Sequence, residues 1–109
     1  MMLNLRTSLE AYEAKFGEPI EAPVVGQHDN ARWKEEPKPD EGVVLTREDG
    51  LQKVDAEYDN GYGGENCFPL YAWTASRVFW VAEYDGATNI AWAPRHPMAI
   101  KPEFSGQDS

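Results

Sequence analysis

The dipeptide Asp85-Gly86 lies between two runs of apolar and aromatic residues and limits the folds open to this chain. Asp-Gly is among the strongest sequence signals for a two-residue hairpin turn. If the turn places Tyr84 opposite Ala87, the register of both strands follows. The expected cross-strand pairs are Phe79 with Trp92, Val81 with Ile90, Trp80 with Ala91, and Val78 with Ala93.

Further strands are expected on the N-terminal side of this hairpin. Residues 70–74 are aromatic-rich and connect tightly to residues 78–84, whose two faces are both apolar, which favours an interior strand. Residues 53–59 alternate, with Val54 and Tyr58 on one face and charged side chains on the other. Residues 43–45 form a short strand candidate, and Glu48-Asp49-Gly50 is expected to be a turn.

A helix is expected over residues 5–16, because four apolar residues fall on one helical face. They are Leu5, Leu9, Tyr12 and Phe16. Thr7 with Glu10 could form a capping box, and Asn4 is an alternative cap. The helix should end near Phe16, because Gly17 can adopt the left-handed conformation and Pro19 cannot continue the helix.

The sequence therefore predicts an α+β fold, with one N-terminal helix packed on an antiparallel meander of four to five strands. The 109 residues suit a single domain over 1–109. Residues 18–42 are expected to be an irregular acidic connector with one short edge strand near Val24, residues 43–97 the sheet, and residues 98–109 a tail that is frayed from Lys101 onward.

Charge is the strongest functional lead. The chain has 19 acidic and 10 basic residues, a net charge of -9, and residues 1–66 hold 15 of the acidic and seven of the basic ones. Affinity for nucleic acid depends chiefly on Lys and Arg, so direct nucleic-acid binding is disfavoured. A basic protein surface is the expected partner.

Two acidic clusters are the candidate partner-binding residues. The first is Asp55, Glu57 and Asp59, which on a strand would stand about 6.6 Å apart on one face, close to the spacing of successive phosphates. The second is Glu35, Glu36, Asp40 and Glu41. A merely solvated surface is the alternative interpretation of both clusters. Trp80 is a further candidate: its ring lies over small neighbours, which suits either an interface anchor or a core side chain.

Enzymatic and metal-dependent functions are disfavoured. Cys67 could pair with His28 or His96, but no local signature supports a nucleophile and base. The tract from Asp55 to Glu65 departs from a calcium loop, so no metal and no cofactor are expected. A single cysteine, no leader and no long apolar run predict a cytoplasmic protein without a membrane span.

The segment Glu83-Tyr84-Asp85-Gly86-Ala87-Thr88 and the motif Pro94-Arg95-His96-Pro97 resemble small proteins encoded by bacteriophages and mobile elements, over roughly residues 53–97. Many small acidic proteins of that origin inhibit host defence, including anti-CRISPR proteins and nucleic-acid mimics. The resemblance implies this biology, with the host-cell cytoplasm as the compartment, and transfers no site residue.

Two functions are therefore expected as alternatives. The first is a non-enzymatic inhibitor whose acidic residues occupy a basic nucleic-acid-binding surface of a host nuclease or surveillance complex. The second is a phage or accessory structural protein that self-associates through the aromatic sheet face containing Trp80.

Overall fold

A computed structural model describes residues 2–28, 36, 38–61, 67–84 and 87–107. These residues form two helices and two antiparallel sheets, so the α+β class is confirmed. The elements in chain order are β1 (Met2–Asn4), α1 (Leu5–Phe16), β2 (Ala22–Val25), α2 (Arg47–Lys53), β3 (Glu57–Asp59), β4 (Leu70–Trp73), β5 (Arg77–Tyr84) and β6 (Ala87–Pro94).

The larger sheet has the strand order β2-β4-β5-β6 and contains the predicted hairpin. All four expected cross-strand pairs are present, and Tyr84 lies opposite Ala87. The Asp85-Gly86 turn itself falls outside the described residues. β5 is an interior strand as predicted, and the edge strand expected near Val24 is β2.

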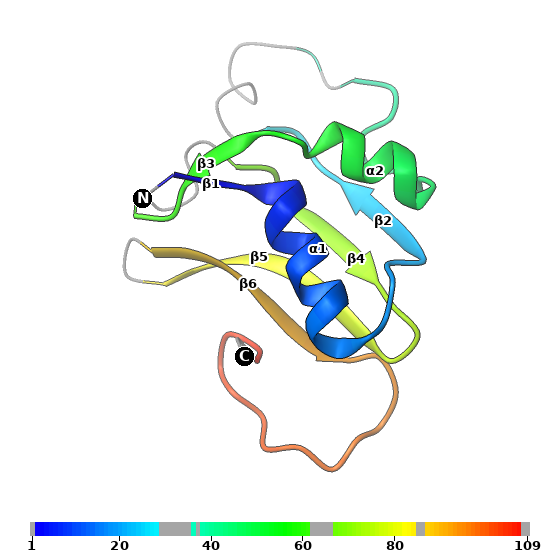
Figure 1. The fold of residues 1–109 in the computed structure, drawn as a ribbon, viewed down its shortest axis with the longest axis vertical. Coiled ribbons are helices and arrows are strands. Elements are labelled where there is room, and N and C mark those ends of the chain that lie inside the picture. The colour runs from blue at the N-terminus through cyan, green and yellow to red at the C-terminus, as the bar shows by residue number, and fades with distance from the viewer. Residues whose placement is uncertain (1, 29–35, 37, 62–66, 85–86, 108–109) are drawn as a thin grey trace.

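Helix α1 lies across one face of this sheet (Figure 1). Phe79 is fully buried, with its ring centroid 6.1 Å from that of Phe16, and Phe16 meets Trp92 edge-on at 5.2 Å. Asn4, the alternative cap, is the one used, because its side chain accepts a hydrogen bond from the Thr7 amide. Gly17 closes the helix with a φ of 65°.

The prediction for residues 43–59 is wrong in its elements. Residues 43–45 form no strand: Val44 makes an isolated bridge to Val24, and the Leu45 amide donates to Pro23 O at 2.9 Å. The expected turn at residues 48–50 lies inside helix α2, and the expected strand 53–59 is reduced to β3, which pairs with β1 in a second small sheet. The alternation that suggested a strand buries Val54 and Tyr58 as expected, but from a helix C-cap and a short strand.

Two local features account for helix α2. Thr46 caps it by accepting a hydrogen bond from the Asp49 amide at 3.1 Å. Gly50 lets the helix approach β2, since a Cβ at this position would overlap the Pro23 ring. A glycine that normally disfavours a helix is therefore required here by packing.

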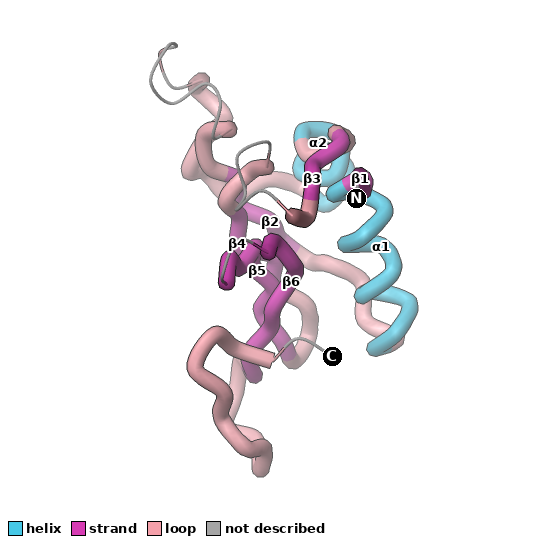
Figure 2. Tube along the Cα trace, turned by 90° about the vertical axis from the view of Figure 1, so that its left-hand side faces the viewer, coloured by secondary structure: helices cyan, strands magenta, loops and turns pink. Residues whose placement is uncertain are grey.

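The C-terminal tail is not frayed over residues 101–107, contrary to the prediction. The tail leaves the sheet after β6, loops outward and returns to it (Figures 1 and 2). Gln107 exchanges two backbone hydrogen bonds with Trp92, of 2.6 and 2.7 Å. The local sequence of the tail does not predict this pairing, because the pairing depends on an edge strand fifteen positions earlier in the chain.

Candidate partner-binding face

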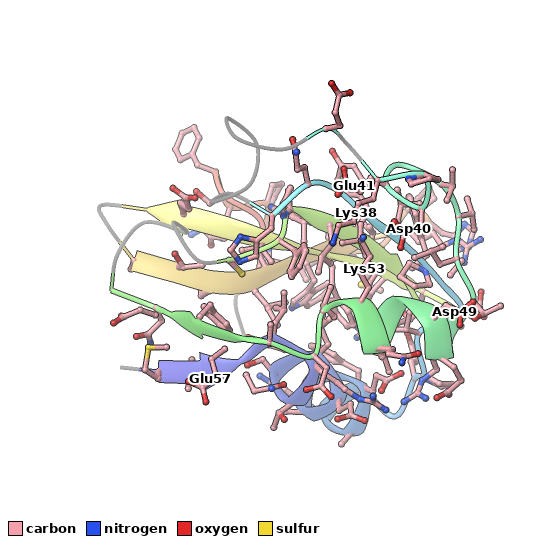
Figure 3. All side chains as sticks on the ribbon, turned by 90° about the horizontal axis from the view of Figure 1, so that it is seen from above. Lys38, Asp40, Glu41, Asp49, Lys53 and Glu57 are labelled. Carbon is pink, nitrogen blue, oxygen red and sulfur yellow. The ribbon has the colours of Figure 1, made fainter. Side chains whose placement is uncertain are left out.

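Residues from both predicted acidic clusters lie on one side of the molecule. The loop 38–45, helix α2 and strand β3 lie along this side (Figures 1 and 3). We call it the acidic face, and define it by the carboxylates that it carries. They are Asp40, Glu41, Asp49 and Glu57.

A pocket of about 450 Å³ opens beside helix α2 on this face. Asp40 and Glu41 line it from the loop, and Asp49 and Lys53 line it from the helix. Asp49 and Lys53 are four positions apart, so both project from the same side of α2. The side chains of Asp40 and Lys53 lie close together above the helix in Figure 3.

Asp40 and Lys53 form the central ion pair of the pocket. Lys53 Nζ donates to Asp40 Oδ1 at 3.0 Å, and the Lys53 side chain is only 11% exposed. This hydrogen bond lowers the pKa of Asp40. The one well-shielded cation of the pocket is thus already neutralised by the loop, and the remaining carboxylates stay available.

Glu41 and Asp49 contribute those remaining charges. Asp49 is exposed at the first turn of α2, where the helix dipole favours a negative charge. Glu41 is partly buried, and its Oε2 is shielded from solvent without a hydrogen-bond partner among the described residues.

The three carboxylates from Asp55 to Asp59 differ in their surroundings. Asp55 precedes β3 and accepts a hydrogen bond from Asn4 Nδ2 at 3.0 Å, with Arg6 at 3.8 Å. Asp59 accepts one from the Gly61 amide at 2.8 Å, which lowers its pKa. Glu57 is exposed on β3. The regular strand spacing predicted for all three therefore holds only between Glu57 and Asp59.

The structure describes only part of the second predicted cluster. Glu35 lies outside the described residues, and Glu36 is described and exposed. Asp40 and Glu41 both line the pocket beside helix α2. Asp49 and Lys53 were not singled out from the sequence, although their i, i+4 spacing would have joined them to the site had residues 47–53 been predicted as a helix.

Many of the basic side chains face the chain's own carboxylates. Among the described residues, five arginines and lysines form ion pairs within the chain. They are Arg6, Arg47, Lys53, Arg77 and Arg95. On the acidic face, Lys53 is paired with Asp40, whereas Lys38 lines the pocket and is exposed. The exposed carboxylates Asp49 and Glu57 still give this face a net negative charge.

Trp80 lies on the sheet surface opposite α1, since its neighbour Phe79 packs against that helix. Its indole contacts the tail, since a Cβ on Gly106 would overlap the ring. Beside it, an apolar pocket of about 270 Å³ is lined by residues that include Tyr71 and Val24, and Tyr71 is 56% exposed. Trp80 is thus neither a fully buried core residue nor an open interface anchor.

The described residues that were considered for catalysis differ in their surroundings. Cys67 is a buried free thiol, and burial raises its pKa to about 11. His28 packs edge-on against Phe68 at 4.7 Å, whereas His96 is exposed on the tail. Among the described residues, no group of three or more His, Cys, Asp and Glu side chains is placed to hold a metal ion.

Neither helix of the described chain is long and apolar enough to cross a membrane. No protein-family model matches the chain, and comparisons with curated proteins and with solved structures find no match.

Proposed function

We propose that this protein is a non-enzymatic acidic binding protein that occupies a basic, nucleic-acid-binding protein surface. The observation that carries the proposal is the acidic face, where carboxylates from the loop 38–45, α2 and β3 lie on one side of the molecule. The class of partner is a host defence or nucleic-acid-handling complex of the kind that anti-CRISPR proteins inhibit.

Electrostatics supports this choice of partner. Five basic side chains are engaged by the chain's own carboxylates, and on the acidic face Lys53 is paired whereas Lys38 is exposed beside the pocket. Exposed carboxylates such as Asp49 and Glu57 can meet phosphate-binding groups without first breaking an ion pair. Association should be fast, and should weaken as salt screens the charges.

The buried thiol argues against the enzymatic alternative based on Cys67. A nucleophilic cysteine needs an accessible thiolate, and burial keeps this thiol protonated near neutral pH. A binding role needs no such group.

Affinity capture from a host lysate tests the proposal. The immobilised protein should retain a nucleic-acid-handling complex that a high-salt wash releases. Asp49 and Glu57 should be reversed to Lys together, because both are exposed. The matched control reverses Glu83 and Glu103, which are also exposed but lie outside the acidic face. Equal retention by both variants would count against the acidic face as the binding surface.

A second candidate function is self-association through the sheet surface that contains Trp80. It is favoured by the apolar pocket that Tyr71 lines, with Tyr71 56% exposed, and by Val44, which bridges to the pocket residue Val24 and is 71% exposed. Light scattering over a range of concentrations distinguishes it from the first, because a strict monomer would exclude it.

A further inference from the structure

The C-terminal tail closes one edge of the larger sheet. β6 is the last strand in the order β2-β4-β5-β6, so its outer backbone groups have no neighbouring strand within the sheet. The Thr88 amide donates to Asn60 O at 2.7 Å, and Tyr12 Oη donates to Ile90 O at 3.3 Å. Trp92 bonds to Gln107 in both directions. An edge strand with free backbone groups can pair with another chain. On β6, these three sets of hydrogen bonds occupy separate parts of the edge.

The tail also covers the large ring of Trp80. Trp80 lies opposite Ala91 in the β5–β6 pairing, and Ala91 is small and buried. The indole reaches the tail at Gly106, which has a φ of +83°. A side chain at this position would overlap the ring and would also strain the backbone. The site therefore selects a turn with glycine over Trp80, which the Gly106 amide closes by donating to Glu103 O at 3.2 Å.

The tail is held by few contacts. Beyond Arg95, the residues up to Ser105 are exposed except for Ile100, which packs against the core. The return to the sheet is secured by the two Gln107–Trp92 backbone bonds and the Gly106 contact, with a hydrogen bond from Gln107 Nε2 to Lys101 O at 2.7 Å. Each such bond adds only a small net stabilisation, because it replaces hydrogen bonds to water.

We propose that this site, formed by the β6 edge at Trp92 and the ring of Trp80, also accepts the tail of a second copy, so that two chains exchange C-terminal tails. The chain's own tail occupies this site in the structure. The tail of a second copy fits it equally well, because it supplies the same glycine and the same backbone groups. The exchanged tail makes the same contacts as the chain's own tail, and the exposed segment that precedes it serves as the hinge. The inference does not depend on the acidic face.

A chain whose own tail cannot dock provides the test. In the full-length Gly106→Val variant, the tail is displaced and the acceptor site stays intact. A peptide with the sequence of residues 100–109 should bind this variant about tenfold more tightly than it binds the wild-type chain, whose own tail competes. The same peptide carrying Gly106→Val should not bind.

Two readouts accompany the binding measurement. Hydrogen exchange at the Trp92 amide reports whether the tail is docked, and should accelerate in Gly106→Val and in Gln107→Pro, which lacks the donor that Trp92 O requires. Phe104→Ala is the control, because the Phe104 side chain is fully exposed and its loss should leave the exchange rate unchanged. Circular dichroism establishes that each variant is folded.

Light scattering then tests the second copy as occupant. The wild-type chain should form dimers in a fraction that rises with concentration, and Gly106→Val should abolish them. If a folded Gly106→Val chain with rapid Trp92 exchange fails to bind the peptide, the site does not accept a tail in trans. If the peptide binds but the wild-type chain is monomeric at every concentration, a second copy is not the occupant.

Discussion

Glu13 and Arg47 form a bidentate ion pair that connects helix α1 to helix α2. Arg47 Nη2 donates to Glu13 Oε1 at 2.7 Å and Nε donates to Oε2 at 2.8 Å, while the Ile20 amide donates to Oε2 at 2.6 Å. Burial alone would raise the pKa of Glu13, but these hydrogen bonds outweigh it and lower that pKa. The pair sets the start of the helix that carries part of the acidic face.

Arg47→Met should lower the free energy of unfolding by about 2 to 4 kcal/mol, because it leaves the shielded Glu13 carboxylate without its main partner. Urea denaturation measures this loss. The control is Arg6→Met: the Arg6–Glu10 pair is 30% and 43% exposed and Arg6 lies 3.8 Å from exposed Asp55, so the loss of these pairs should cost less than about 1 kcal/mol. Equal losses would contradict a special role for the Glu13–Arg47 pair.

Stability should fall in acid through Glu18. Hydrogen bonds from Ser76 and Thr74, with the positive charge of Arg77, lower the pKa of Glu18 from 4.5 to about 2. A carboxyl whose pKa is lower in the folded state stabilises the fold fully above its unfolded pKa. That contribution is lost as the pH falls from about 4.5 toward 2.

Glu18→Gln isolates this contribution. Urea midpoints should differ clearly between wild type and variant at pH 6, and the difference should shrink as the pH approaches 2. A difference that is constant over this range would mean that the Glu18 charge is not what stabilises the connection between β4 and β5.

Gly50→Ala should destabilise the protein by about 1 to 3 kcal/mol, since a Cβ would overlap the Pro23 ring beneath helix α2. Alanine ordinarily stabilises a helix relative to glycine by about 1 kcal/mol, so the sign of the effect is informative. Gln52→Ala on the exposed side of α2 serves as the control and should change stability by less than about 0.5 kcal/mol. A stabilising Gly50→Ala would contradict the close packing of α2 on β2.

The Cys67 thiol should be unreactive in the folded protein, because it is buried and burial raises its pKa to about 11. An aromatic disulfide reagent at pH 8 should release little chromophore from the native chain and one equivalent after denaturation. Rapid labelling of the native chain would reopen the catalytic interpretation of this residue.

The hairpin could be predicted in detail because its information is local. Asp85-Gly86 specifies a turn, and once Tyr84 faces Ala87 every pair up to Val78 and Ala93 follows. Helix α1 could be predicted equally well, because its apolar periodicity lies within the segment and its C-terminal signal, Gly17, follows it directly.

Helix α2 and the tail could not be predicted in the same way. The seven residues of α2 include Gly50, which is needed because the helix packs closely on Pro23, 27 positions away in the sequence. The tail depends on Gly106 meeting Trp80 and on Gln107 pairing with an edge strand. Asp40, Glu41 and Glu57 were named from the sequence, but their grouping with Asp49 on one face required the position of α2.

Competition with nucleic acid is the most direct test of the acidic face. A labelled nucleic acid bound to the captured partner should be displaced by the wild-type protein, with a midpoint that rises steeply with salt. Reversal of Asp49 and Glu57 to Lys should raise that midpoint about tenfold or more at low salt, while reversal of Glu83 and Glu103 should leave it nearly unchanged. Displacement that is equally strong for both variants and insensitive to salt would contradict the proposed function.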